Sequence, residues 1–214
     1  TNHRIAIEIP YSFLVNTGER DELIELQEER DLIIAESIRA GTKTHDTLPL
    51  ARRTPGEQTE ADPEDWKRML DTNVLGVLHA VHAVLPDMLA RRSGHLVLLG
   101  SVAGRSLFPD ATVYCATKSA VHVIAEGLRS ELVRRRRTDD NRIRVSLLAP
   151  GAVDTPLPET IADDDARAAT TAWYADMDGI LQAEDVAKTA RWVLDAPEHV
   201  SINEVVVRPT SMAR

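Results

Sequence analysis

Length, composition and charge restrict the classes of protein to which this chain can belong. Its 214 residues are enough for one α/β domain with a sizeable core, and 43% of them are hydrophobic. The formal net charge of −9 argues against nucleic acid or an anionic membrane as the main partner, and we see no apolar run that would span a bilayer. Cys115 is the only cysteine, the seven histidines show no metal-ligand spacing, and no export leader is visible. We therefore expect a cytoplasmic protein without a disulfide or a metal site.

The first 61 residues give weaker signals than the rest. Apolar stretches at 4–9, 12–17 and 47–50 are candidate short strands. Residues 20–40 predict an amphipathic helix that ends at Gly41, with an apolar side made of Leu23, Ile24, Leu26, Ile34 and Ile38. A polar loop follows at 51–61, and no repeat or linker divides the chain.

From position 62 the elements are clear. Asp62 is the expected N-cap of a long helix with Pro63 in its first turn; we expect a kink at Pro86 and an end at Ser93–Gly94. Short apolar runs at 95–100 and 143–148 predict strands that are buried on both faces. A second long helix is expected at 113–137, a further helix at 184–194 and a last strand at 202–207. This alternation predicts a parallel sheet flanked by helices.

Tyr114 and Lys118 lie four residues apart at the start of the second long helix, so they share one helical face. A free phenol has a pKa of about 10, and a nearby ammonium lowers it by favouring the phenolate. Such a pair can act as a general acid and base near neutral pH. Ser101 directly follows the strand at 95–100, and ligands of open α/β sheets bind at the carboxyl ends of strands. We therefore expect Ser101 and Tyr114 to meet there.

These residues resemble the motifs of the short-chain dehydrogenases/reductases over about 150 residues, from position 61 to the end. Tyr114 and Lys118 resemble the family's Tyr-x-x-x-Lys, Ser101 its serine 13 residues earlier, and Asn73 its helix asparagine. The resemblance implies a Rossmann-like doubly wound parallel sheet, reduced here on its N-terminal side. It implies that Tyr114 exchanges a proton with the substrate oxygen, that Ser101 hydrogen-bonds this oxygen, and that Asn73 anchors a water of the proton relay.

The same resemblance implies a nicotinamide cofactor, NAD or NADP, that exchanges a hydride with the substrate. Pro150 and Gly151 resemble the family's Pro-Gly motif after the sixth strand, with Thr155 at the carboxamide of the nicotinamide. The implied cofactor-binding residues are Asn73, Tyr114, Lys118, Pro150, Gly151, Val153 and Thr155. If residues 12–17 form the second strand, Arg20 would favour NADP through its 2′-phosphate.

The N-terminal part departs from the family pattern. The family holds the pyrophosphate with a glycine-rich turn, Thr-Gly-x-x-x-Gly-x-Gly, because glycines let the backbone approach the phosphates. The glycines before position 76 are Gly18, Gly41 and Gly56, which do not form this motif. The family's Asn-Asn-Ala-Gly stretch is also absent, and Ala51 or Arg52 would replace the aspartate that pairs with adenine. We therefore expect one domain, with an atypical part at 1–61 and a catalytic part at 62–214.

Three functions remain open from the sequence. The first is a nicotinamide-dependent oxidoreductase that interconverts an alcohol and a carbonyl, with a cofactor site that is built by other means or with an N-terminal segment that the given sequence lacks. The second is a cofactor-independent cyclase, isomerase or eliminase that uses the same acid–base residues. The third is a catalytically silent subunit that holds an active homologue.

Substrate and partners are expected as follows. Residues 156–182 would form a lid, with an apolar lining of Leu157, Ile161, Trp173, Tyr174, Met177 and Ile180, over a small or mid-sized, partly hydrophobic substrate. In the family, the helices at 63–92 and 113–137 pair subunits, so we expect a homo-oligomer, dimer or tetramer.

Overall fold

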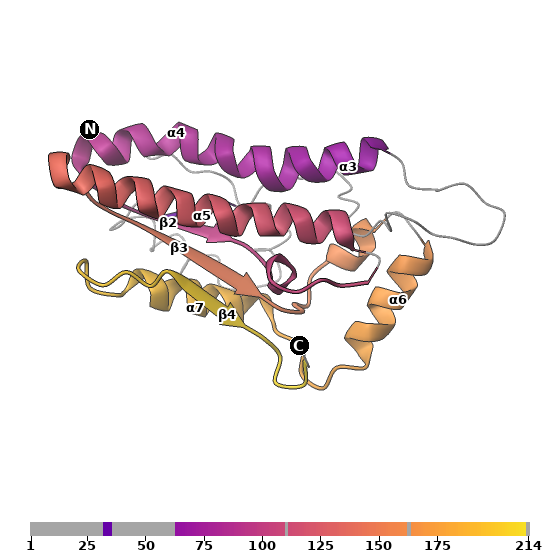
Figure 1. Cartoon of the computed structure of the whole chain (residues 1–214). Helices are drawn as coiled ribbons and strands as arrows, with labels where there is room; N and C mark the ends of the chain where they lie inside the picture. Colours follow the sequence, from indigo (N-terminus) through magenta and orange to yellow (C-terminus); the bar gives the residue numbers. More distant parts are fainter. Residues whose placement is uncertain (1–31, 36–62, 110, 162–163, 213–214) are drawn as a thin grey trace.

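The computed structural model describes residues 32–35, 63–109, 111–161 and 164–212 (Figure 1). Its elements in chain order are β1 Leu32–Ala35, α3 Pro63–Leu70, η1 Asp71–Leu75, α4 Gly76–Arg91, β2 Ser93–Leu99, η2 Val102–Gly104, α5 Thr112–Asp139, β3 Arg142–Pro150, η3 Leu157–Thr160, α6 Asp164–Ala175, α7 Ala183–Leu194 and β4 Glu204–Val207. The expected alternation of helix and strand after position 62 is confirmed.

The four described strands form one parallel sheet in the order β1-β2-β3-β4. β2 and β3 pair along their length, from Ser93 opposite Arg142 to Leu99 opposite Leu148. Both are central strands, and most of their residues are buried because helices cover both faces. The sheet therefore brings the carboxyl ends of β2 and β3 to one edge, beside η2 and the start of α5 (Figure 1).

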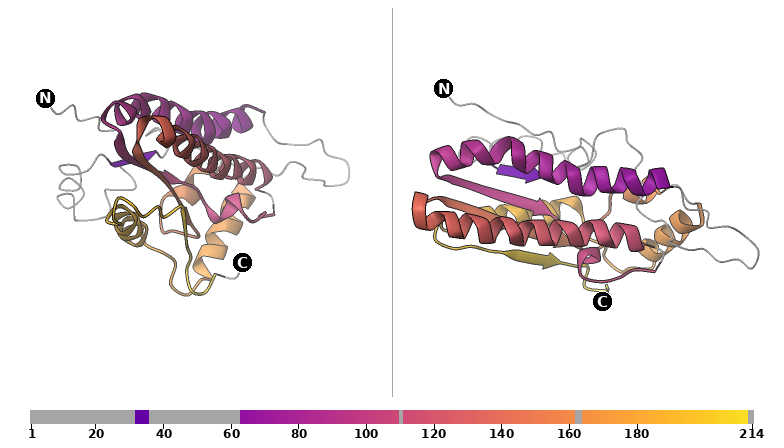
Figure 2. Two further views of the ribbon diagram at one scale, coloured as in Figure 1. Left: turned by 60° about the vertical axis from the view of Figure 1, so that its left-hand side comes forward. Right: turned by 45° about the horizontal axis from the view of Figure 1, so that its top comes forward.

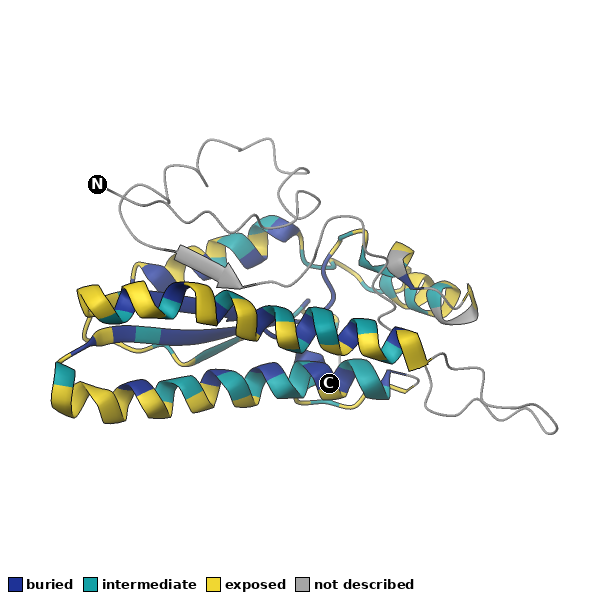
Figure 3. Ribbon diagram, turned by 90° about the horizontal axis from the view of Figure 1, so that it is seen from above, coloured by how far each residue is buried: buried dark blue, intermediate teal, exposed yellow. Residues whose placement is uncertain are grey.

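Two long helices cover one face of the sheet and α7 covers the other (Figure 2). On the first face, α4 contributes Val77, Val81, Val84 and Met88 to a buried cluster, and this spacing repeats one helical side. Residues of α5 and alternate residues of β2 and β3 complete that cluster. On the other face, Val186, Ala190 and Leu194 of α7 pack on Val97 and Leu148 of the sheet. The outward sides of the two long helices are exposed (Figure 3).

Pro63–Arg91 is one helix interrupted by a π-helical turn, η1. It begins at Pro63 with Glu64 and Asp65 in its first turn, where acids favour the helix dipole. The predicted end at Ser93–Gly94 is wrong. The helix ends at Arg91, Arg92 caps it in the left-handed conformation with φ 59°, and Ser93 already begins β2. Backbone pairing with β3 recruits these two residues into the strand whatever their side chains.

The predicted amphipathic helix at 20–40 is also wrong where the structure describes it. Leu32–Ala35 is a strand, β1, which pairs in parallel with His95 to Leu98 of β2. Four consecutive apolar residues suit a strand as well as a helix, and pairing with a central strand satisfies their backbone groups. The other expectations for residues 1–61, including the short strands, Arg20, Ala51 and Arg52, lie outside the described residues, as does the N-cap Asp62.

By length and composition alone, the helix Pro63–Arg91 is apolar enough to cross a bilayer, so the expectation that no run qualifies does not hold for this test. Val77, Val81, Val84 and Met88 of α4 pack against the sheet and α5 in the core cluster, whereas Leu78 is exposed. A core helix of a folded domain passes the same test, so the finding is weak evidence for a membrane span.

Candidate active site

Ser101 lies where the sequence predicted, at the carboxyl end of β2. Leu99 pairs with Leu148, and the amide of Gly100 donates to the carbonyl of Leu148 at 2.8 Å. Ser101 itself is extended, with φ −167°, and its Oγ accepts a hydrogen bond of 3.0 Å from the amide of Ala103. This contact uses the oxygen only as an acceptor. The hydroxyl proton therefore stays available to a substrate oxygen.

Tyr114 and Lys118 lie in the first two turns of α5, and both are partly exposed. The Lys118 Nζ is 5.8 Å from the centre of the Tyr114 ring. Tyr114 packs against the small buried cluster of Ala103, Ala111 and Cys115, and Ala103 belongs to the η2 turn that Ser101 caps. The structure thus brings Tyr114, Lys118 and the Ser101 turn together, with an ammonium beside a phenol.

Asn73 lies in the π-helical turn and is 8% exposed. Its Nδ2 donates a hydrogen bond of 3.1 Å to Thr117 Oγ1, and this hydroxyl donates to the carbonyl of Tyr114 at 2.7 Å. The asparagine therefore ties η1 to the backbone between Tyr114 and Lys118. π-Helical turns of this kind are frequent at functional sites.

The residues expected at the cofactor follow β3 on the same edge of the sheet. Pro150 ends the strand, and the amide of Gly151 donates to the carbonyl of Val207 in β4 at 2.7 Å. A Cβ on Gly151 would lie 2.7 Å from the sulfur of Met212. The C-terminal segment therefore leaves too little space at position 151 for a residue larger than glycine. Val153 is buried and pairs with Leu181, and the Thr155 hydroxyl accepts a hydrogen bond of 3.4 Å from the amide of Leu157, where the predicted lid begins.

Helix α6, in the segment predicted to form a lid, contacts the loop after η2 through aromatic rings. Trp173 of α6 lies 6.0 Å from Phe108 and 5.5 Å from Tyr174, between ring centres. Phe108 packs on the cluster that also holds Tyr114. Ile161 is buried, and Arg167 Nη1 holds its carbonyl at 2.7 Å, while the other expected lining residues are partly exposed. An aromatic surface therefore lies next to the predicted acid–base residue.

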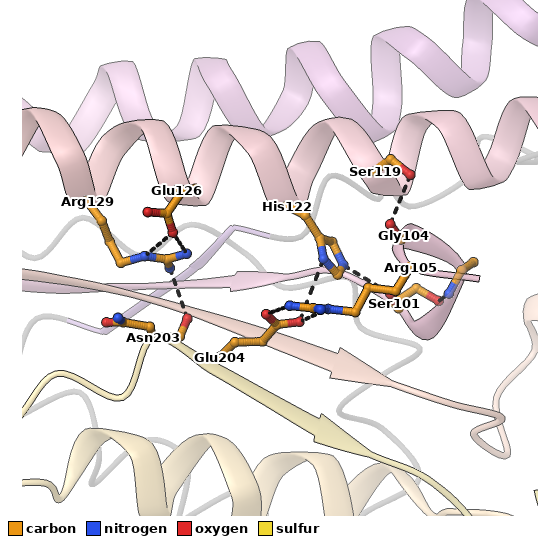
Figure 4. A network of polar contacts seen from close by, with 10 residues as sticks. Ser101, Gly104, Arg105, Ser119, His122, Glu126, Arg129, Asn203 and Glu204 are labelled. Carbon is orange, nitrogen blue, oxygen red and sulfur yellow. Dashed lines mark hydrogen bonds and ion pairs between the residues drawn. The ribbon is translucent and has the colours of Figure 1, made fainter. Parts of the chain in front are cut away.

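Sequence reasoning missed His122, which lies one turn beyond Lys118 on α5 (Figure 4). Its Nε2 is 3.1 Å from the carbonyl oxygen of Ser101, and its Nδ1 is 3.7 Å from Glu204 Oε1 in β4. Arg105 Nε donates to the same Glu204 oxygen at 2.6 Å. The spacing 114, 118, 122 continues one helical face, and this regularity was the available signal.

These polar groups have shifted pKa values with identifiable causes. Burial lowers the pKa of His122, although the Ser101 carbonyl and the charge of Glu204 act in the opposite direction. The hydrogen bond from Arg105 is the main cause that lowers the pKa of Glu204. Around neutral pH, His122 is therefore uncharged and Glu204 is ionised.

The described residues suit the nicotinamide end of a dinucleotide. The polar groups at this edge are the Lys118 ammonium, the Tyr114 and Thr155 hydroxyls and the backbone after β3, which together suit a ribose and a carboxamide. For the pyrophosphate end, the sequence lacks the glycine-rich turn, and residues 1–31 lie outside the described part. Within the described ranges, no group of three or more His, Cys, Asp or Glu side chains is arranged to hold a metal ion.

A family model and several known proteins each match more than half of the chain. The family model for short chain dehydrogenases matches residues 50–166. An uncharacterized oxidoreductase of Staphylococcus saprophyticus is 38% identical over 150 residues, which are 70% of this chain and 58% of the relative. An uncharacterized oxidoreductase of Staphylococcus aureus is 31% identical over 181 residues, which are 82% of this chain and 71% of the relative. The chain thus spans less than two thirds of the length of the first of these relatives.

Solved structures of dehydrogenases and reductases are also similar to this chain. The closed form of a serine dehydrogenase complexed with NADP+ is 31% identical, with a TM-score of 0.63 over 72% of this chain and 60% of that one. A 3-oxoacyl-[acyl-carrier protein] reductase from Brucella melitensis with bound NAD is 28% identical, with a TM-score of 0.55 over 78% of this chain and 61% of that one. An alcohol dehydrogenase from Thermococcus sibiricus, at 21% identity and a TM-score of 0.62, supports the fold alone.

Proposed function

Since the chain belongs to the short-chain dehydrogenase/reductase family, we propose that it is a nicotinamide-dependent oxidoreductase that interconverts an alcohol and a carbonyl. The observation that supports this most is the placement of Tyr114 and Lys118 on one face of α5, next to the turn that Ser101 begins. Structural neighbours bound to NADP and to NAD support a nicotinamide cofactor without choosing between them. The choice of NADP rests only on Arg20 of the sequence.

In the proposed reaction, each side chain acts at the substrate oxygen or beside it. Tyr114 gives its phenolic proton to this oxygen in reduction and takes the proton back in oxidation. Ser101 donates its hydroxyl proton to the same oxygen and orients it. The positive charge of Lys118 favours the phenolate form of Tyr114. A bound nicotinamide would supply or accept the hydride, and Lys118, Tyr114 and Thr155 are the groups that would hold its ribose and carboxamide.

The proposed substrate is a small or mid-sized carbonyl or alcohol with an apolar part. Phe108 packs on the same small cluster as Tyr114, Trp173 contacts the Phe108 ring, and contact with rings favours apolar groups. Lid residues Leu157, Tyr174, Met177 and Ile180 are half-buried, which suits side chains that gain cover when a substrate binds.

Turnover by variants tests the acid–base assignment. Tyr114→Phe removes the proton donor and leaves the ring, so we expect kcat to fall by at least about a hundredfold while the melting temperature changes little. Ser101→Ala should lower kcat too. Ser130→Ala, at an exposed position of α5, is the control and should leave kcat unchanged. Full activity of Tyr114→Phe would show that the assigned site is wrong.

The missing glycine-rich turn supports two alternatives. In one, the same residues catalyse a cyclisation, isomerisation or elimination without a dinucleotide. In the other, the chain is a silent subunit of an active homologue. A purified chain that turns over a substrate without nicotinamide supports the first, whereas activity that appears only after mixing with a homologue supports the second.

We also propose that the chain forms a homo-oligomer through the helices Pro63–Arg91 and Thr112–Asp139. Their outward sides expose large apolar side chains: Leu70, Leu75, Leu78, Val123 and Val133. Light scattering at micromolar concentration should therefore give at least twice the chain mass of 23.6 kDa. A monomeric mass would contradict this proposal.

A further inference from the structure

His122 occupies a space that two glycines leave open on either side of Ser101. A Cβ on Gly100 would lie 2.9 Å from His122 Nε2, and a Cβ on Gly104 would lie 2.4 Å from the same atom. The imidazole is therefore in close contact with the backbone of the turn. The His122 side chain is only 13% exposed, so water does not compete for its hydrogen bond to the turn.

The hydrogen bond from His122 fixes the tautomer of the ring. The Ser101 carbonyl is only an acceptor. His122 Nε2 must therefore carry a proton to donate the hydrogen bond of 3.1 Å to the Ser101 carbonyl oxygen. The neutral ring then has its lone pair on Nδ1, which faces Glu204 Oε1 at 3.7 Å. Protonation of Nδ1 would turn this contact into an ion pair.

Glu204 is itself held in place. Two nitrogens of the Arg105 guanidinium, Nε and Nη2, donate to its two carboxylate oxygens, and Arg105 follows directly after η2. The charged groups that face His122 are thus Glu204 from β4, Arg105 from the η2 loop and Lys118 from its own helix. Ser119 adds a second tie, because its hydroxyl donates to the carbonyl of Gly104 at 3.0 Å.

We propose that His122 is a positioning residue for Ser101, and that Glu204 and Arg105 hold its ring so that the last strand supports the catalytic turn. The ring contacts the backbone of Ser101 and leaves its hydroxyl free for substrate. The catalytic consequence rests on the proposed function, but the contact itself does not. Misplacement of a reacting group by about 1 Å can lower a rate by roughly a hundredfold, so support behind Ser101 affects kcat.

NMR of the whole chain tests the contact without any need for turnover. We expect imidazole nitrogen spectra to show the proton of neutral His122 on Nε2, and the Ser101 carbonyl carbon to titrate with the same midpoint as the ring, below pH 6.5. Glu204→Gln keeps the shape of the side chain but removes its charge, so it should lower that midpoint further. A proton on Nδ1, or a Ser101 carbonyl that ignores the ring, would overturn the proposal.

Kinetics then tests the consequence. We expect His122→Leu to lower kcat roughly tenfold or more, with KM and NADPH affinity nearly unchanged, and His122→Gln to restore most of the loss through its amide donor. His199→Leu, at an exposed histidine far along the chain, is the control. Unchanged kcat in folded His122→Leu would refute the positioning role; if that variant does not fold, the titration of wild type and Glu204→Gln decides. Absence of turnover in the wild type would instead refute the proposed function and leave the NMR result valid.

Discussion

The buried His95 makes a sharp prediction about stability and pH. It lies in β2 opposite Arg144 and is 5% exposed. Ser146 Oγ donates to the carbonyl of Ile202 at 2.6 Å, so it accepts from His95 Nε2 at 2.8 Å. The neutral ring suits this arrangement. Burial, and secondly the charge of Arg144, lower the pKa of His95 from 6.5 to about 4.

The sign of the effect follows from proton uptake. Between pH 6.5 and 4 the unfolded chain binds a proton at His95 that the folded chain does not, so acid favours unfolding. Stability is therefore complete above pH 6.5 and falls as the pH drops toward 4. With these two pKa values, lowering the pH from 7.5 to 5 removes about 2 kcal/mol from the free energy of unfolding.

Urea unfolding at pH 7.5 and pH 5.0 measures this difference, and His95→Gln is the matched comparison. The glutamine amide can still donate to Ser146 but does not titrate. Carboxylates and the other histidines are common to both proteins, so their contributions cancel. We expect the loss of stability at pH 5.0 to be about 2 kcal/mol smaller in His95→Gln than in the wild type. Equal losses in the two proteins would refute the reasoning.

Two further predictions concern the turn and the helix pair. Gly104→Ala would place its Cβ 2.9 Å from the carbonyl oxygen of Lys118 and 2.4 Å from His122 Nε2, so we expect urea unfolding to show a loss of about 1–3 kcal/mol. Gly127→Ala meets nothing within 4 Å on α5 and should gain up to about 1 kcal/mol; equal effects would contradict this account. A double-mutant cycle of Asn73→Ala and Thr117→Val should give a coupling of about 1 kcal/mol from their buried hydrogen bond, and additive effects would argue against it.

Much of the fold after position 62 follows from local patterns. The apolar runs in β2 and β3 predict buried strands, and the helical repeat of α4 predicts the face that packs on them. Strand ends are less predictable, because Ser93 and Arg142 join the sheet through backbone pairing. The side-chain pattern of the sequence does not indicate which residues at a strand end pair through their backbone.

β1 shows where a local pattern misleads. Leu32–Ala35 lies inside the predicted helix at 20–40, with Ile34 on its apolar side, but the structure pairs this segment with β2. A short apolar run is compatible with both states, and only the presence of a neighbouring strand decides between them. The π-helical turn around Asn73 is likewise absent from the sequence pattern, since helical spacing does not distinguish it from an ordinary turn.

The candidate site divides in the same way. Tyr114 and Lys118 are predictable because a helix brings residues four apart together, and Ser101 because strands of a parallel sheet end at one edge. His122 depends on Glu204, which lies 82 positions later in the chain, and on the space beside Gly104. Asn73 meets Thr117 across 44 positions. Such contacts arise only when the elements pack.

Binding of a nicotinamide dinucleotide tests the central claim most directly. We would titrate the purified chain with NADPH and NADH and follow cofactor fluorescence and melting temperature. A cofactor at a hundred times its Kd stabilises the native state by about 2.7 kcal/mol, which raises the melting temperature by about 5–10 °C for a chain of this size. We expect such a shift with at least one of the two cofactors. No change with either would contradict a nicotinamide-dependent oxidoreductase and favour cofactor-free chemistry or a silent subunit.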